Sequence, residues 1–182
     1  MKSENIMRKL LFIAGCTALI CAANVNDSQA ASATSNSTGI VVTPIAISKQ
    51  VDLNFGKFMS GASLGTVAVS TSDVQTPGGG VTSTTNLAAS AKAAKFQVSG
   101  EPSATYALSL PGSPITMTGP GGATMTVDTF TSVVDVGTLN AGVGTLPASG
   151  PQVLTVGATA HVAASQASGS YTGTFDVSVD YN

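Results

Sequence analysis

The sequence contains no tryptophan, few aromatic side chains and little charge. Of its 182 residues, 5% are aromatic and 9% are charged. Exposed helix faces are normally filled with Glu, Lys and Arg, so this composition disfavours a helical protein. A nucleic-acid-binding surface needs clustered Lys and Arg, and the near balance of 7 basic and 9 acidic residues argues against one. The abundant residues are Ala, Ser, Thr, Val and Gly, which are typical of half-buried strands and turns.

The beginning of the chain has the pattern of a secretory signal peptide. Arg8 and Lys9 precede an apolar run over residues 10–23, and a polar stretch then ends in Ser28-Gln29-Ala30. A basic start, an apolar run of this length and a small-x-small ending are typical of a cleavable signal. We therefore predict cleavage after Ala30 and export to the periplasm, and from there to the cell surface or the extracellular space. The run is too short for a comfortable membrane-spanning helix, so we expect no stable membrane span in the mature chain.

Both cysteines of the chain, Cys16 and Cys21, lie in that apolar run. Cys16 allows a second interpretation, because Ile13-Ala14-Gly15-Cys16 resembles a bacterial lipoprotein box, where cleavage before the cysteine leaves a lipid anchor. With a cut after Ala30, the mature chain keeps no cysteine and no arginine. A disulfide and a zinc site with cysteine ligands are then excluded.

Few of the remaining side chains suit catalysis. The one histidine, His161, falls on the polar face of its predicted strand, and no cysteine accompanies it. Asp176 and Asp180 share a strand face, but their Cβ atoms should lie roughly 13 Å apart, beyond the ~9.5 Å limit of a glycosidase pair. The glycine-rich stretches 77–80 and 119–122 lack the Lys-Ser/Thr of a phosphate loop and are interpreted as turns. We predict that the chain is not an enzyme and that it binds no cofactor and no metal ion.

Short apolar alternations separated by Gly and Pro run through the rest of the chain. A period of two with such punctuation predicts a β-sandwich or barrel. The clearest strands are residues 153–162 and residues 174–182. We predict one β-sandwich domain over residues 49–182. The segment before it, residues 31–48, is interrupted by Pro44, so its β-prone part belongs at a sheet edge or bends between two strands.

The C-terminal strand alternates apolar and polar residues, Tyr181 is the penultimate residue, and Gly169 is the fourteenth residue counted back from Asn182. In these features it resembles the final strand of the pilins assembled by bacterial chaperone–usher systems. Within that superfamily, residues 52–56 and 169–181 are similar to archaic pilins and spore coat protein U. The archaic pilins usually carry a disulfide, whereas this mature chain holds no cysteine.

Three further stretches resemble a group of small exported bacterial proteins known only as a domain of unknown function. These are Leu53-Asn54-Phe55-Gly56, the Gly-Glu-Pro-x-Ala-Thr-Tyr stretch from Gly100 to Tyr106, and Val156-Gly157-Ala158. With the terminal strand, the resemblance extends over most of the mature chain.

The pilin resemblance implies an all-β, immunoglobulin-like antiparallel sandwich that lacks its final strand. The C-terminal strand would then border an open groove. The residues implied for that acceptor side are Gly169, Phe175, Val177, Val179 and Tyr181. An extended segment of another copy would fill the groove, and its candidate donor side chains are the β-branched Ile40, Val42, Ile45 and Ile47.

The resemblance therefore predicts an exported structural subunit of a bacterial surface fibre or coat, of the adhesive fimbrial type, assembled by strand exchange between copies. A periplasmic chaperone and an outer-membrane usher are the further partners that it implies. The alternative is a monomeric secreted β-sandwich module that binds a sugar or a protein. The ring of Tyr181 would lie in an intermolecular groove in the first case and inside a closed sandwich in the second.

Overall fold

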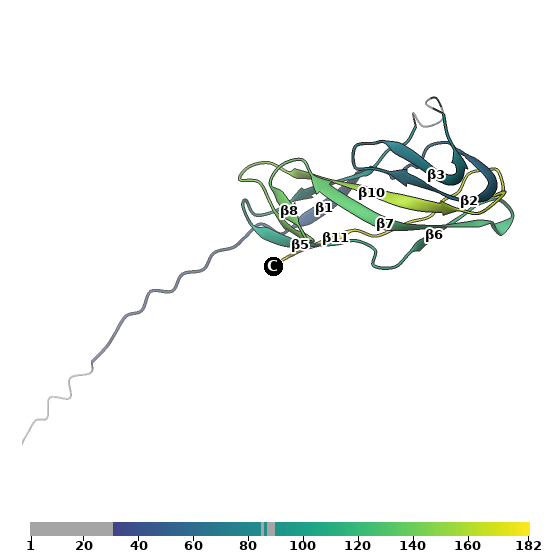
Figure 1. The fold of residues 1–182 in the computed structure, drawn as a ribbon. Coiled ribbons are helices and arrows are strands. Elements are labelled where there is room, and N and C mark those ends of the chain that lie inside the picture. Colours follow the sequence, from purple (N-terminus) through teal and green to yellow (C-terminus); the bar gives the residue numbers. More distant parts are fainter. Residues whose placement is uncertain (1–30, 85, 87–89) are drawn as a thin grey trace, which may run out of the picture. The chain divides into compact units, whose positions relative to one another are not determined.

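The computed structural model describes residues 31–84, 86 and 90–182. Contacts within the chain separate residues 1–40 from a compact unit, Val41–Asn182, whose fold is described below. The predicted signal peptide lies outside the described residues. The named elements are β1 (Ala46–Val51), β2 (Met59–Val69), β3 (Gln75–Thr82), β4 (Ala94–Ser99), β5 (Thr105–Ser109), β6 (Ile115–Thr118), the 3₁₀ turn η1 (Pro120–Gly122), β7 (Thr124–Val134), β8 (Thr138–Asn140), β9 (Val143–Thr145), β10 (Gln152–Val162) and β11 (Ser178–Tyr181) (Figure 1).

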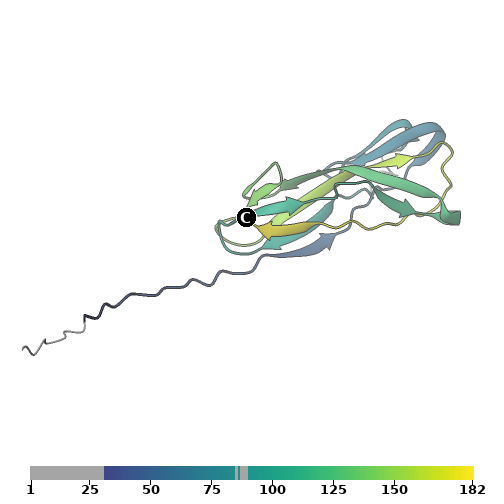
Figure 2. The same ribbon diagram turned by 90° about the horizontal axis from the view of Figure 1, so that it is seen from below.

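The strands form two antiparallel sheets, which confirms the predicted all-β sandwich. In the larger sheet, the first half of β10 pairs with β4 and its second half pairs with β2 along the same edge. Strand β1 lies beyond β4, and β3 lies beyond β2. Along its other edge β10 pairs with β7, which in turn pairs with β6. The smaller sheet has the order β11-β5-β9-β8. Figure 2 shows the yellow β11 beside β5, close to β1 at the end of the larger sheet.

The central strand β10 follows the alternation predicted for residues 153–162. Its even-numbered residues from Leu154 to Val162 are all buried, whereas His161 is exposed. Burial of each Val or Leu side chain stabilises the fold by about 1.5–3 kcal/mol. The alternation in this strand therefore sets the inner face of the larger sheet.

Strand β7 changes face at a bulge. Asp128 pairs with Thr159 and Thr131 with Gly157, so two residues of β7 oppose one of β10, and Thr129 between them has φ +51. A bulge shifts the alternation by one residue. Both Val127 and Phe130 can therefore face the core.

The prediction of a turn at residues 77–80 is wrong, because these residues lie inside β3. The strand pairs with β2 at the edge of the larger sheet, where a proline such as Pro77 can be accommodated. The glycines allow the two backbones to approach closely: a Cβ on Gly80 would lie 2.1 Å from the Ser63 carbonyl oxygen. By contrast, residues 119–122 form the turn between β6 and β7, as predicted.

The predicted start of the domain at residue 49 is also wrong, because β1 begins at Ala46. Ile47 pairs with Val98 of β4, and both Ile45 and Ile47 pack against the core of their own chain. Pro44 precedes β1 rather than interrupting it. At the other end, the strand predicted over residues 174–182 pairs with β5 from Ser178 to Tyr181, and the Asn182 N–H donates to the Thr105 carbonyl at 3.3 Å, whereas residues 174–177 are not paired with any residue that the structure describes.

Candidate functional site

Residues 173–177 run between two anchored points without a ladder of their own. Before them, the Thr118 and Thr172 backbones exchange two hydrogen bonds of 2.8 and 3.0 Å, and after them Ser178 pairs with Ser109 of β5. The opposite chain, residues 110–117, is longer and includes Pro111 and Pro114, which have no N–H to donate. Among the described residues, none makes a backbone hydrogen bond with residues 173–177.

The end of the larger sheet has a second unpaired edge. Strand β1 pairs on one side with β4, and this ladder continues to Asn54, whose backbone exchanges two 2.8 Å hydrogen bonds with Lys92. In the part of the chain that the structure describes, no strand pairs with the other side of β1 or with the outer side of β11. These two strands, one from each sheet, are neighbours. Unpaired edges of this kind can accept a further strand.

A groove of about 870 Å³ lies between residues 53–60 and residues 166–171. Its lining residues are Leu53, Asn54, Phe55, Gly56, Lys57, Phe58, Met59, Ser60, Met117, Met125 and 166–171. Leu53, Phe58, Met117 and Tyr171 are only half-buried, although they pack against the fully buried core. The hydrophobic core is therefore incompletely covered at this position.

The reason lies in how the two sheets overlap. One buried cluster joins both sheets, because it contains Tyr106 and Val179 of the smaller sheet with Leu154 and Val156 of β10. The other cluster draws its strand residues from the larger sheet alone. Chain segments such as residues 53–58 and 166–171, rather than a second sheet, cover that cluster, and the groove lies between them.

One wall of the groove is held by Gln166. Its side chain accepts a hydrogen bond from the Ala163 N–H at 3.0 Å and donates to the Thr124 carbonyl at 3.2 Å and the Tyr171 hydroxyl at 2.8 Å. The Tyr171 hydroxyl in turn donates to the Ala167 carbonyl at 2.7 Å. These bonds hold the loop in place along this wall of the groove.

Gly169, predicted on the acceptor side, lies in this wall. It has φ +149, and a Cβ there would be 2.3 Å from Cγ of Pro120. Only glycine combines this backbone conformation with so close an approach. A local physical reason thus exists for glycine at this distance from the C-terminus.

The other predicted acceptor residues pack into the cluster that joins the two sheets. Val179 is buried, and Phe175, Val177 and Tyr181 are half-buried against it. The Phe175 ring centroid lies 5.2 Å from that of Phe130 and 6.3 Å from that of Phe96. The structure therefore brings these four residues together in one hydrophobic cluster between the two sheets.

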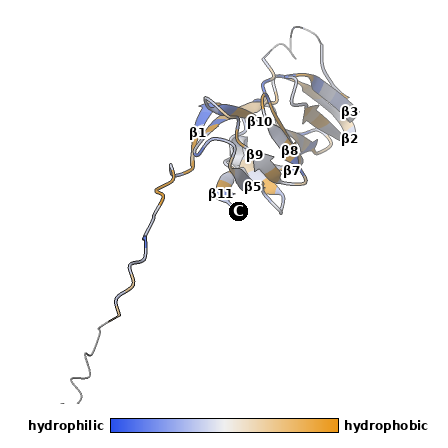
Figure 3. Cartoon of the chain, turned by 90° about the vertical axis from the view of Figure 1, so that its left-hand side faces the viewer, coloured by the Kyte–Doolittle hydropathy of each residue, from blue (hydrophilic) through white to orange (hydrophobic). Residues whose placement is uncertain are grey.

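The predicted donor residues divide into two pairs. Ile45 and Ile47 belong to the core of their own chain, so they are not free to enter another. Ile40 is 91% exposed and Val42 is 53% exposed. Figure 3 shows the hydrophobic colouring of the segment that leads into β1. Only the second pair remains available as donor side chains.

Sequence reasoning missed both the methionines of the groove and a serine motif. Residues 61–65 read Gly-x-Ser-x-Gly, which in hydrolases places a nucleophilic serine on a sharp strand-to-helix turn. Here the motif lies inside β2, where Ser60 pairs with Val81 and Gly65 with Gly79, so the intervening residues form a bulge. The structural setting required for such a nucleophile is therefore not present in the strand.

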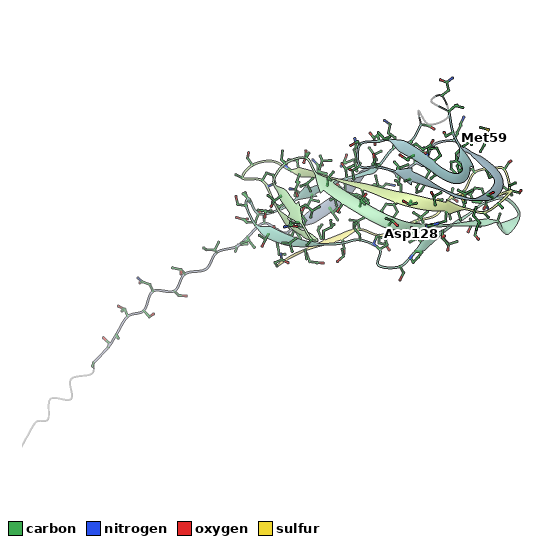
Figure 4. The ribbon with its side chains drawn as sticks, viewed as in Figure 1. Met59 and Asp128 are labelled. Carbon is green, nitrogen blue, oxygen red and sulfur yellow. The ribbon has the colours of Figure 1, made fainter. Side chains whose placement is uncertain are left out.

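A histidine and an aspartate are hydrogen-bonded on the outer face of the larger sheet. His161 Nε2 is 2.9 Å from Asp128 Oδ1, and this hydrogen bond lowers the pKa of Asp128, with Thr129 contributing a second one. Figure 4 labels Asp128 on β7 and Met59 on β2. Among residues 31–84, 86 and 90–182, no group of three or more His, Cys, Asp or Glu side chains could hold a metal ion. The same residues include no helix long and apolar enough to cross a membrane.

The family model described as Domain of unknown function (DUF4402) matches residues 45–181. The chain belongs to this family. No curated protein and no solved structure matches the chain. The DUF4402 match begins one residue before β1 and ends at Tyr181, so it spans both unpaired edges and the groove.

The methionines of this DUF4402 protein allow the solvent accessibility of the groove to be measured. All three methionines of residues 31–182 line it: Met59 is 49% exposed, Met117 is half-buried and Met125 is 4% exposed. We expect hydrogen peroxide to oxidise Met59 first and Met125 last, because sulfoxide formation requires access to the sulfur atom. Peptide mass mapping over a time course measures the order. The unfolded chain in guanidinium is the control, in which the three rates should converge; equal rates in the folded chain would contradict this description of the groove.

Proposed function

We propose that this protein is an exported structural subunit of a bacterial surface fibre or coat, in which an extended segment of one copy enters the groove of the next as an additional β-strand. The observation that supports this most is the combination of unpaired backbone at residues 173–177 with an incompletely covered apolar core beside it. Strand addition uses main-chain hydrogen bonds for affinity and apolar pockets for alternate side chains. Gly173 lies against Met117, which lines the groove, so the unpaired backbone begins beside it.

The donor segment in this proposal is the N-terminal arm, residues 31–42. Every residue of the arm is exposed. At about 3.3 Å per residue it spans about 40 Å, whereas residues 173–181 span about 30 Å, so its reach is sufficient. Ile40 and Val42 lie on one face of an extended chain, and their burial would contribute about 3–6 kcal/mol before the cost of ordering the arm.

Export and the assembly partners belong to the same proposal. The N-terminal pattern over residues 1–30 supports secretion, and the resemblance of the terminal strand to pilins supports a periplasmic chaperone and an outer-membrane usher. A chaperone is also reasonable on physical grounds, because an unpaired edge beside an apolar groove favours aggregation.

A second candidate function is a monomeric secreted module that binds a sugar or a protein. The observation that favours it is the volume of the groove, about 870 Å³, which lies within the range of small-molecule pockets. In that case the groove would be filled by a ligand rather than by another copy, and the arm would play no part.

The test compares aspartate substitutions at adjacent valines of the arm. We expect Val42→Asp, alone or with Ile40→Asp, to abolish fibres seen by electron microscopy, because a carboxylate would have to enter an apolar groove. Val41→Asp is the matched control: Val41 is 99% exposed and points to the opposite face of an extended arm. The full exported chain is used throughout, and deletion of residues 31–42 should also leave a folded subunit without fibres.

Two outcomes would contradict the proposal. Normal fibres from the Val42→Asp chain or from the deletion would remove the donor role of the arm. A wild-type chain that stays monomeric in size-exclusion chromatography, even at high concentration, would favour the binding module instead.

A further inference from the structure

The backbone of Thr43 is held on both sides where the arm joins the domain. Its N–H donates to Glu101 Oε2 at 2.9 Å, and its carbonyl accepts from the Tyr181 hydroxyl at 2.7 Å. The Tyr181 hydroxyl also accepts from the Glu101 N–H at 2.5 Å. Three distant parts of the chain therefore meet at one point: the start of the domain, the turn after β4 and the last strand.

The Tyr181 ring packs closely against the backbone of Gly100. A Cβ on Gly100 would lie 2.3 Å from the Tyr181 hydroxyl oxygen, so a larger residue there would displace the ring. The ring itself packs against the cluster that joins the two sheets. Pro44 follows Thr43, and a residue before proline is restricted to extended backbone. Thr43 is thus fixed in position, in conformation and in hydrogen bonding.

This arrangement matters because an arm of this length could reach the groove of its own domain. To do so it would have to reverse direction immediately before β1 and lie beside it as a hairpin. The reversal would require a turn at residues 42–44, where the extended Thr43-Pro44 pair disfavours one. It would also require the N–H and carbonyl of Thr43, which Glu101 and Tyr181 already occupy.

We propose that Glu101 and Tyr181 form a clasp on Thr43 that keeps the arm out of its own groove and so commits it to a second copy. The clasp rests on the proposed function, since it concerns the same arm and groove. Glu101 and Tyr181 act as positioning residues, because they hold the base of the arm.

The test removes the hydrogen bonds of the clasp while keeping its shape. In the full exported chain, Tyr181→Phe with Glu101→Ala removes all three bonds and retains the ring. We expect this variant to remain monomeric, with the amides of residues 31–42 exchanging with deuterium about tenfold more slowly than in wild-type monomer, because the arm now pairs within its own domain. Glu101→Gln, which keeps an acceptor oxygen for the Thr43 N–H, is the matched control and should still assemble.

A second variant avoids any loss of stability in the domain. Insertion of Gly-Asn-Gly after Val42 supplies a turn while Thr43 stays bound to Glu101 and Tyr181, so we expect its arm to remain unprotected and the chain to assemble. If wild-type chains and the Tyr181→Phe, Glu101→Ala variant assemble equally well with unprotected arms, or if the insertion variant is monomeric with a protected arm, the clasp has no such role. If wild-type chains do not assemble, the proposed function fails, whatever the arm does in the variants.

Discussion

Replacement of Tyr106 by alanine is expected to lower the free energy of unfolding by about 3–5 kcal/mol, the cost of deleting a fully buried aromatic side chain. Tyr106 lies on β5 and has no exposed surface. Stabilities of single domains are typically about 5–15 kcal/mol. The substitution should therefore remove a large part of the stability of this domain.

The hydroxyl of Tyr106 anchors a buried polar network between the sheets. It donates to Gln152 Oε1 at 2.5 Å, and Gln152 Nε2 donates to the carbonyls of Val136 and, at 3.1 Å, Thr145. Burial raises the pKa of the Tyr106 hydroxyl, so it remains a donor at neutral pH. Gly144 leaves room for the Tyr106 ring, because a Cβ there would lie 2.1 Å from Cζ of Tyr106.

Urea denaturation of three variants separates packing from hydrogen bonding. Tyr106→Phe keeps the ring but leaves the Gln152 carbonyl oxygen without its donor, so we expect a loss of about 1–3 kcal/mol. Val143→Ala, at an exposed position beside Gly144, is the control and should change stability by less than about 0.5 kcal/mol. A Tyr106→Ala chain as stable as the Val143→Ala chain would show that this network does not join the two sheets.

The second large effect is expected at Asp73, in the turn between β2 and β3. Its Oδ1 accepts from the N–H of the buried Ala93 at 2.8 Å, and its Oδ2 lies 3.6 Å from the Nζ atoms of both Lys92 and Lys95. Asp73 also has φ +62. Asp73→Ala should cost about 2–4 kcal/mol, because it leaves the Ala93 N–H unsatisfied and places alanine in a left-handed conformation.

The same contacts give Asp73 a defined pH dependence. The hydrogen bond from Ala93 lowers the pKa of Asp73 below its ordinary value of 3.8, and the two lysines act in the same direction. A lowered pKa in the folded state stabilises the fold above the unfolded pKa, and this contribution is lost as the pH falls through the folded pKa. Asp73→Asn keeps an acceptor and tolerates φ > 0 but carries no charge. Its stability deficit relative to wild type should therefore shrink between pH 7 and pH values below about 4; a constant deficit would contradict the role of the carboxylate charge.

The clasp and the groove lie at different places on the domain: the chain is held closed at the clasp and is open at the groove. At the Tyr181 end, β1 and β11 are joined through Thr43, and at the other end residues 53–60 and 166–171 stand apart around the groove. An incoming strand would complete the hydrogen bonding of residues 173–177 without disturbing the clasp. This division explains how one domain could hold the base of its own arm and accept the arm of another copy.

Much of the fold could be predicted because its signals are local. The alternation from Leu154 to Val162 identified the inner face of β10, since one face of a strand must be apolar when it covers a core. The turn at residues 119–122 followed from glycine and proline alone. Of the candidate site, Phe175, Val177, Val179 and Tyr181 could be assigned to one apolar face from the spacing of the last strand.

The rest depended on which strands became neighbours, and a sequence does not state that directly. Residues 77–80 carry turn chemistry but form a strand, because β2 provides a ladder and a close backbone surface beside them. Ile45 and Ile47 have the pattern of a free donor strand, yet β4 pairs with that segment and takes it into the domain. The groove arises because the smaller sheet covers only part of the larger one. Residues 173–177 stay unpaired because the chain opposite them is longer and contains two prolines. The sequence alone determined which segments form strands and which of their faces are apolar, because these follow from side chains a few residues apart. The tertiary structure decided which strand edges stay unpaired, where the groove lies and how Thr43 is held, because these depend on contacts between residues far apart in the chain.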